Sequence, residues 1–191
     1  MGYDVTDDNG YWEIGPIPNA DDPGYSTLDL YAVWELSDDK RQVENYGGSP
    51  YRWYSHTYND VTDGTLNFGA YYIPNDSREE GAMWIFQDMR RAWEYLVQWS
   101  DPGFARVKWE RGGTGIWLFT INCFWPFSPL EGILIVNEED SPDMIVHEMG
   151  HHYIHNLGRW PWDEHDLFEA IECVGHGIWD QTNPTCYLRL G

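Results

Sequence analysis

The chain has 191 residues, of which 42% are hydrophobic, and this suits one domain or one domain plus a fragment of another. Its 32 acidic residues against 11 Lys and Arg residues give a formal net charge of -21. This balance argues against nucleic acid as a partner, because a polyanion binds to a basic surface that the composition does not supply. A substrate with a cationic or neutral face is easier to accommodate.

Two further features bear on the compartment of the protein. No stretch reaches the roughly 20 apolar residues that cross a bilayer, and the N-terminus lacks the basic and apolar segments of a signal peptide. We therefore expect no membrane span. The three cysteines, Cys123, Cys173 and Cys186, leave at least one thiol unpaired if a disulfide forms. A Cys173–Cys186 disulfide and three buried thiols are both compatible with the sequence.

Residues 1–36 have the pattern of β structure. The turn sequence DDNG precedes the alternating YWEI, and the link GPIPNADDPG leads to the run TLDLYAVWEL. The pattern TDDNGYWEIGPIPN resembles the prealbumin-like or carboxypeptidase-regulatory-like β modules of secreted proteins. The resemblance implies a partial β-sandwich-like module at 1–36, and it implies that the protein is secreted or lies at the cell surface.

Residues 37–76 show no clear periodicity, and we expect an irregular linker or the start of a catalytic domain there. A helix follows, because Ser77 and Glu80 form a capping box and apolar residues then recur at spacings of three and four until Asp101-Pro102-Gly103. The segments RVKWER, GIWLFTINCFW and GILIV are typical of strands. The expected order is therefore helix, strand, strand, strand, helix.

The last helix of that series, SPDMIVHEMGHHYIHNLG, carries the candidate site. Ser141 suits the N-cap, and Gly158 suits a left-handed helix end. His147 and His151 are four residues apart and project from one face, as two imidazoles that bind one metal ion must. Glu148 lies about 100° round the helix from His147, so its carboxylate is beside the metal and can take a proton from water. The arrangement HExxH is typical of zinc metalloproteases.

A catalytic zinc ion needs a third protein ligand and an open fourth position. The segment DLFEAIECVGHGIW has the apolar stripe of a helix, and Glu169 lies within it, 18 residues beyond His151. A carboxylate in such a stripe is costly unless it is paired or bound to metal. Glu172, about one turn further along, is the competing candidate for the third ligand.

HEMGH followed by FEAIE resembles the gluzincin metallopeptidases, whose second helix carries a similar N-E-A-I run. The resemblance implies that His147, His151 and Glu169 bind Zn²⁺. It also implies that Glu148 is the general base for hydrolysis of a peptide bond by zinc-activated water. Because the EAI run aligns with Glu169, the resemblance favours this residue over Glu172.

The chain departs from the gluzincin pattern at two positions. Phe168 stands where the family has asparagine, and Cys173 stands where it has aspartate, which leaves open the group that orients His147. The resemblance implies an α+β fold over 77–191, with a zincin-like core of an active-site helix, a glutamate helix and a small sheet behind an N-terminal β-strand fragment. In that core the strand Gly132 to Val136 is expected to be the edge that pairs with an extended peptide.

Several other residues on or between the two helices are alternative ligands. The metzincin pattern HExxHxxGxxH does not fit, because Ile154 and Leu157 stand where its glycine and third histidine belong. We expect an exposed or outer role for His155. The remaining candidates are expected to be ordinary surface residues: His152, Asp163, His165 and His176.

A rival interpretation is a non-catalytic extracellular binding or structural module that retains the HExxH helix as core. The chain ends soon after the predicted third ligand, as expected for a catalytic domain truncated at its C-terminus. Its 12 Trp and 13 Tyr also suit contacts with a polysaccharide or a protein. A purely structural zinc site fits less well, because two histidines and one carboxylate leave a coordination position open.

Overall fold

The computed structural model describes residues 2–7, 9–18, 27–62, 64–113, 123–125, 132–136 and 141–158. The chain divides into two compact units, each made of two segments. Unit 1 comprises Met1–Trp34 and Arg52–Tyr72, and unit 2 comprises Glu35–Tyr51 and Ile73–Gly191. Helices and strands are both present, so the expected mixed α+β class is confirmed.

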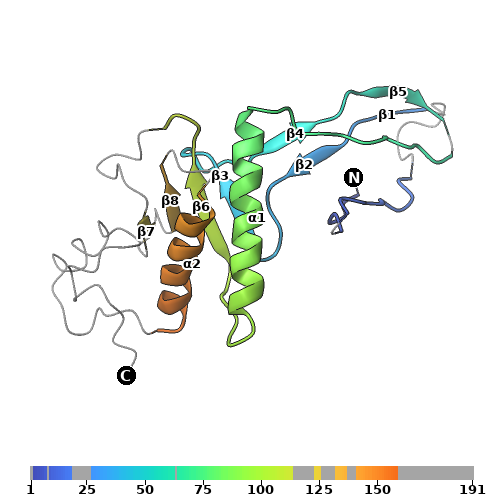
Figure 1. Ribbon diagram of the computed structural model, residues 1–191. Helices are drawn as coiled ribbons and strands as arrows, with labels where there is room; N and C mark the ends of the chain where they lie inside the picture. The colour runs from blue at the N-terminus through green and yellow to red at the C-terminus, as the bar shows by residue number, and fades with distance from the viewer. Residues whose placement is uncertain are drawn as a thin grey trace. The chain divides into compact units, whose positions relative to one another are not determined.

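Unit 1 is built on two short two-stranded sheets (Figure 1). β1 (Leu28–Leu30) pairs antiparallel with β5 (Tyr58–Val61), and β2 (Val33–Glu35) pairs with β4 (Arg52–Tyr54). Aromatic rings pack on these strands: Trp34 stacks on Trp53 at 6.1 Å between ring centroids. The β structure expected for the run TLDLYAVWEL is therefore confirmed as two short strands.

The N-terminal turn forms, but the strand expected after it does not. Asp7 Oδ1 accepts hydrogen bonds of 2.8 Å from the backbone N–H groups of Asn9 and Tyr11, which closes the DDNG turn. The segment 11–14 that follows is not in a strand, because no neighbouring strand pairs with it among the described residues. The β-sandwich-like character of 1–36 stays a prediction.

The core of unit 2 is a four-stranded mixed sheet. Its strand order is β3 (Arg41–Glu44), β6 (Ala105–Trp109), β8 (Gly132–Ile135) and β7 (Cys123–Trp125). The first three strands are parallel, and β7 runs antiparallel to β8. Burial alternates along β6, as the alternating sequence predicts, whereas every residue of β8 is buried.

The prediction that the segment Gly132 to Val136 forms an edge strand is wrong. β8, which contains most of the segment Gly132 to Val136, lies between β6 and β7 and has a hydrogen-bonded neighbour on each side. The outer strand on that side of the described sheet is β7. On the opposite side, isolated bridges from Ser37 and Pro50 continue the pairing beyond β3.

Both helices of the described residues cover the same face of this sheet (Figure 1). α1 (Arg78–Leu96) packs on β3 and β6, α2 (Pro142–Asn156) packs on β7 and β8, and the two helices contact each other. The order α1, β6, β7, β8, α2 confirms the expected series of elements. Neither helix is long and apolar enough to cross a membrane, which agrees with the expectation for these segments.

The helix ends follow from local sequence chemistry. Ser77 Oγ accepts a hydrogen bond of 3.0 Å from Glu80 N. The Glu80 carboxylate accepts from the backbone N–H of Asp76, and not from that of the N-cap residue Ser77 as in a standard capping box. Ser141 occupies the N-cap of α2 without a side-chain cap bond, and Gly158 ends this helix at φ 65°. The helices predicted after Ser77 and after Ser141 are confirmed, and the predicted helix that carries Glu169 lies outside the described residues.

An ion pair ties the two parallel strands β3 and β6 together. Glu44 and Lys108 are direct neighbours across the strands, and Lys108 Nζ lies 2.6 Å from Glu44 Oε1. Gln42 Nε2 donates to the other carboxylate oxygen at 2.7 Å, and Arg106 Nε lies 3.4 Å from it. The Glu44 side chain is buried, so this carboxylate depends on these partners.

Candidate metal centre

The orientation of the candidate residues on α2 follows from which side of this helix is buried. Ile145, Met149 and His152, spaced at four and three residues, are buried in unit 2 and fix the rotation of the helix about its own axis. His147 and His151 are only half-buried and project from a neighbouring side of the same helix. The rotation of α2 that buries these three residues therefore leaves the His147 and His151 imidazoles partly exposed.

The two imidazole nitrogens that a metal would use already face each other. Nε2 of His147 lies 3.1 Å from Nε2 of His151, and the rings are nearly perpendicular, at 88°, with centroids 4.6 Å apart. Two nitrogens that each lie about 2.0 to 2.1 Å from one ion, at a tetrahedral angle, are about 3.3 to 3.4 Å apart. The observed separation is therefore close to the bite that one zinc ion requires.

Glu148 is buried beside this pair, with 4% of its surface exposed. At 100° per residue, its side chain lies between the buried row and the histidine side of α2. A carboxylate shielded from bulk solvent and next to two imidazoles is suited to accept a proton from a water molecule held at the same place. This is the arrangement that the HExxH spacing predicts.

His152 does not lie on the surface, so the expectation for this residue is wrong. It is 5% exposed, and burial, followed by the nearby charge of His155, lowers its pKa to about 4. The imidazole is therefore neutral at pH 7. Its Nε2 lies 3.0 Å from Asn156 Nδ2, one turn further along the helix. His155 itself is half-buried.

Asn156 is a residue that the sequence interpretation missed. Its Nδ2 donates a hydrogen bond of 2.5 Å to the carbonyl oxygen of Pro102, which joins the last turn of α2 to the turn after α1. The signal was present in part, because Asn156 is four residues beyond His152 and therefore on the same face. Its contact with the Pro102 carbonyl could not be predicted, because it depends on how α2 packs against the turn after α1.

The predicted third ligand and the alternative ligand residues that follow residue 158 lie outside the described residues. These are Glu169, Glu172, Asp163, His165 and His176, together with Cys173 and Cys186. Among the described residues, no three His, Cys, Asp or Glu side chains cluster as metal ligands. The described part of the candidate centre is therefore one pair of imidazoles and one buried carboxylate on a single helix.

Comparison of the chain with protein-family models, with curated proteins and with solved structures gives no match. The interpretation of α2 therefore rests on its own residues, namely the positions of His147, Glu148 and His151 and the separation of the two imidazoles. The gluzincin resemblance of HEMGH and FEAIE stays a prediction.

Proposed function

We propose that the chain is a zinc-dependent metallopeptidase of the gluzincin type, with a zincin-like core, that hydrolyses peptide bonds. The metal ligands are His147, His151 and Glu169, and Glu148 is the general base. The observation that carries the proposal is the 3.1 Å separation of the two histidine Nε2 atoms on a helix that also buries a glutamate beside them. Its place outside the cell or at the cell surface is proposed from the resemblance of TDDNGYWEIGPIPN to the β modules of secreted proteins.

The donor set suits zinc. Two imidazole nitrogens and one carboxylate are the three protein ligands of a catalytic zinc site, which keeps its fourth position open. When bound, the ion polarises the scissile carbonyl and makes water at that position more acidic. The protein's own contribution is to hold the two nitrogens close to the required bite before the ion arrives, so that little reorganisation opposes binding.

Glu148 moves the proton. Its carboxylate accepts a proton from the attacking water as the water oxygen bonds to the carbonyl carbon. It then donates that proton to the leaving nitrogen as the C–N bond breaks. Because Glu148 neighbours His147 in the chain and is shielded from solvent, the proton is exchanged at the site and not with bulk water. One residue therefore serves both transfers.

An extended substrate pairs best with β7. Among the described strands, β7 has a hydrogen-bonded partner on one side only, and it packs against the helix that carries the histidines. An unpaired strand edge binds an extended peptide by main-chain hydrogen bonds. This assignment replaces the segment Gly132 to Val136, whose strand lies inside the sheet. The net charge of -21 favours peptides that are not strongly acidic.

The test is the metal content of the purified chain by mass spectrometry, compared with Glu169→Ala and Glu172→Ala. We expect one zinc ion per chain, lost in Glu169→Ala only. Glu148→Gln is expected to retain zinc and to lose peptidase activity, because an amide cannot accept the proton. A parent chain that binds no zinc after loading would refute the metallopeptidase.

A non-catalytic binding module is the second candidate, and one observation favours it. Tyr31 and Tyr54 of unit 1 are 56% and 58% exposed, and their ring centroids lie 6.4 Å apart. Exposed aromatic pairs are common at surfaces that contact saccharides or proteins. This function would be supported if the parent chain holds no zinc but binds a saccharide or protein ligand, and if the Tyr31→Ala and Tyr54→Ala variants do not bind that ligand.

A further inference from the structure

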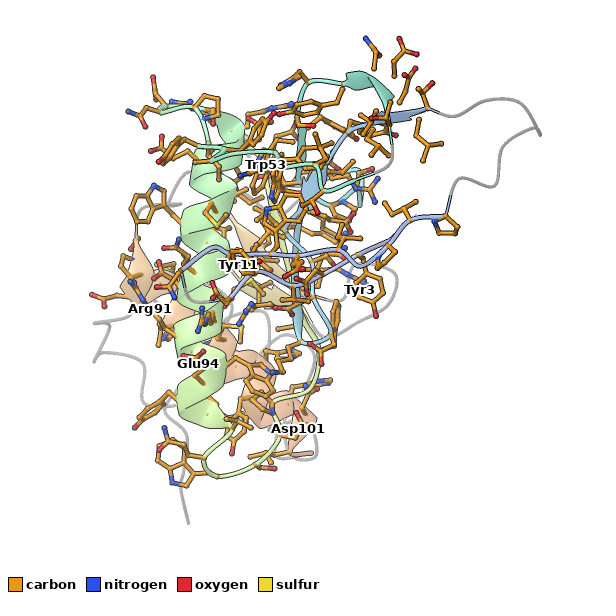
Figure 2. All side chains as sticks on the ribbon, turned by 90° about the vertical axis from the view of Figure 1, so that its right-hand side faces the viewer. Tyr3, Tyr11, Trp53, Arg91, Glu94 and Asp101 are labelled. Carbon is orange, nitrogen blue, oxygen red and sulfur yellow. The ribbon has the colours of Figure 1, made fainter. Side chains whose placement is uncertain are left out.

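The turn that follows α1 is held by a hydrogen bond from each helix. Asn156 Nδ2 donates to the carbonyl oxygen of Pro102 at 2.5 Å, and Trp93 Nε1 donates to that of Gly103 at 3.2 Å. Asp101, labelled on this turn in Figure 2, accepts a bond of 2.8 Å from Gly103 N. The turn is therefore a fixed anchor, and Asn156 attaches α2 to it.

Gly103 makes room for this attachment. Its φ is 74°, in the left-handed region, and a Cβ built on it would lie 2.7 Å from Asn156 Nδ2. A side chain at this position would displace the amide from the Pro102 carbonyl. The glycine and the asparagine therefore form one contact.

The same amide reaches back along α2. A primary amide carries two hydrogens, so Asn156 can donate one to the Pro102 carbonyl and the other to His152 Nε2, which lies 3.0 Å away. His152 is buried, follows His151 directly and lies one turn beyond Glu148. The two hydrogen bonds thus run from the turn to His152, the residue that follows His151 in the chain.

A helix moves as a rod over such short distances, so an anchor at its last turn also fixes the turns before it. Each residue of slip would rotate the helix surface by about 100° and shift it by about 1.5 Å. Building on the proposed zinc site, we propose that Asn156 is a positioning residue. It locks α2 against the turn after α1 and so holds the His147–His151 pair, whose internal spacing the helix itself sets, in place relative to the rest of the proposed zinc site.

The test compares Asn156→Leu with Gln98→Met. Both residues are exposed, and both changes replace an amide by an apolar group of similar size. Gln98 Nε2 donates to the Glu94 carbonyl of its own helix, whereas Asn156 joins α2 to the turn after α1. Zinc affinity is measured by competition with a chromophoric chelator, the coordination geometry by the visible spectrum of the Co²⁺-loaded chain, and stability by melting in chelator. Asn156→Gln, which keeps the donor group, is the rescue variant.

We expect Asn156→Leu to lower zinc affinity about 10- to 100-fold and to alter the Co²⁺ spectrum, as loss of a supporting contact does in other metal sites. Gln98→Met should match the parent, and Asn156→Gln should recover part of the affinity. An Asn156→Leu chain that melts earlier but keeps the parent's zinc affinity and Co²⁺ spectrum would overturn the positioning role. If the parent itself binds no zinc, the proposed function fails and this inference fails with it.

If Asn156→Leu does not fold, Gly103→Ala decides the question. A Cβ at Gly103 would lie 2.7 Å from Asn156 Nδ2 and displace the amide, so we expect a zinc affinity below that of the parent and of Gln98→Met. An affinity equal to that of the parent would then refute the role.

Discussion

The Nε2 atoms of His147 and His151 lie 3.1 Å apart across one turn of α2. His155 is also one turn beyond His151, but among the described residues it belongs to no group of three side chains that could hold a metal ion. We therefore predict that His147→Ala lowers zinc affinity at least about 100-fold, because one of the three proposed ligands is lost. The matched change His155→Ala should leave affinity within about threefold. Chelator competition measures both, and equal losses in the two variants would contradict the assignment.

The buried His152 predicts a loss of stability in acid. Its pKa is lowered from 6.5 to about 4 in the folded chain, so the unfolded chain binds the proton more readily between these values. The stability that neutral His152 contributes is complete above about pH 6.5 and declines as the pH falls towards 4. The full difference corresponds to about 3 kcal/mol.

Urea unfolding between pH 4 and pH 7, with chelator present, measures this effect. His152→Gln should flatten the dependence on pH, because glutamine is neutral throughout and can still accept from Asn156. His155→Gln serves as the control on the same helix and should keep most of the slope. A His152→Gln chain with the parent's slope would show that other groups cause the loss.

The sequence was sufficient for the helices and for the geometry within α2, and the reason is that both are local. Capping at Ser77, the left-handed end at Gly158 and the four-residue spacing of His147 and His151 all depend on residues within a few positions of each other. The separation of the two imidazoles follows from helix geometry alone. For this reason the described part of the site agrees with the predicted spacing.

The sequence was insufficient where pairing partners are distant. A fully apolar strand such as β8 fits the edge or the middle of a sheet equally well, and only the antiparallel addition of β7 shows that it is internal. The strands β3, β4 and β5 lie in the segment 37–76 and are only three or four residues long, too short for a clear periodicity. The burial of His152 could not be predicted because it depends on how α2 packs in unit 2, with Pro102 of the turn after α1 close to the imidazole.

The Glu44–Lys108 ion pair predicts an asymmetric response to substitution. Lys108→Met leaves the buried carboxylate with weaker partners, and we expect it to destabilise unit 2 by about 2 to 4 kcal/mol. The double variant Glu44→Leu/Lys108→Met removes both charges and should recover most of this loss. Chemical denaturation at pH 7 measures both variants.

An exposed ion pair supplies the control for this prediction. Arg90 Nε lies 2.7 Å from Glu94 Oε1, with side chains 40% and 56% exposed, and Glu94 is labelled on α1 in Figure 2. Glu94→Gln should change stability by less than about 1 kcal/mol. If Glu94→Gln and Lys108→Met cost the same, burial of Glu44 is not the cause.

The place of β3 in the sheet predicts which part of the chain folds as a unit. A chain of residues 77–191, the span expected for the catalytic domain, lacks β3 and so leaves β6 with β8 as its one parallel neighbour among the described strands. It also loses Val43, which is fully buried, and Arg41, whose guanidinium lies 4.6 Å from the Phe86 ring of α1. We expect this chain to unfold without a cooperative transition and to bind a hydrophobic dye. Residues 35–191, which keep β3, should retain cooperative unfolding of unit 2; equal behaviour of the two chains would show that β3 is dispensable.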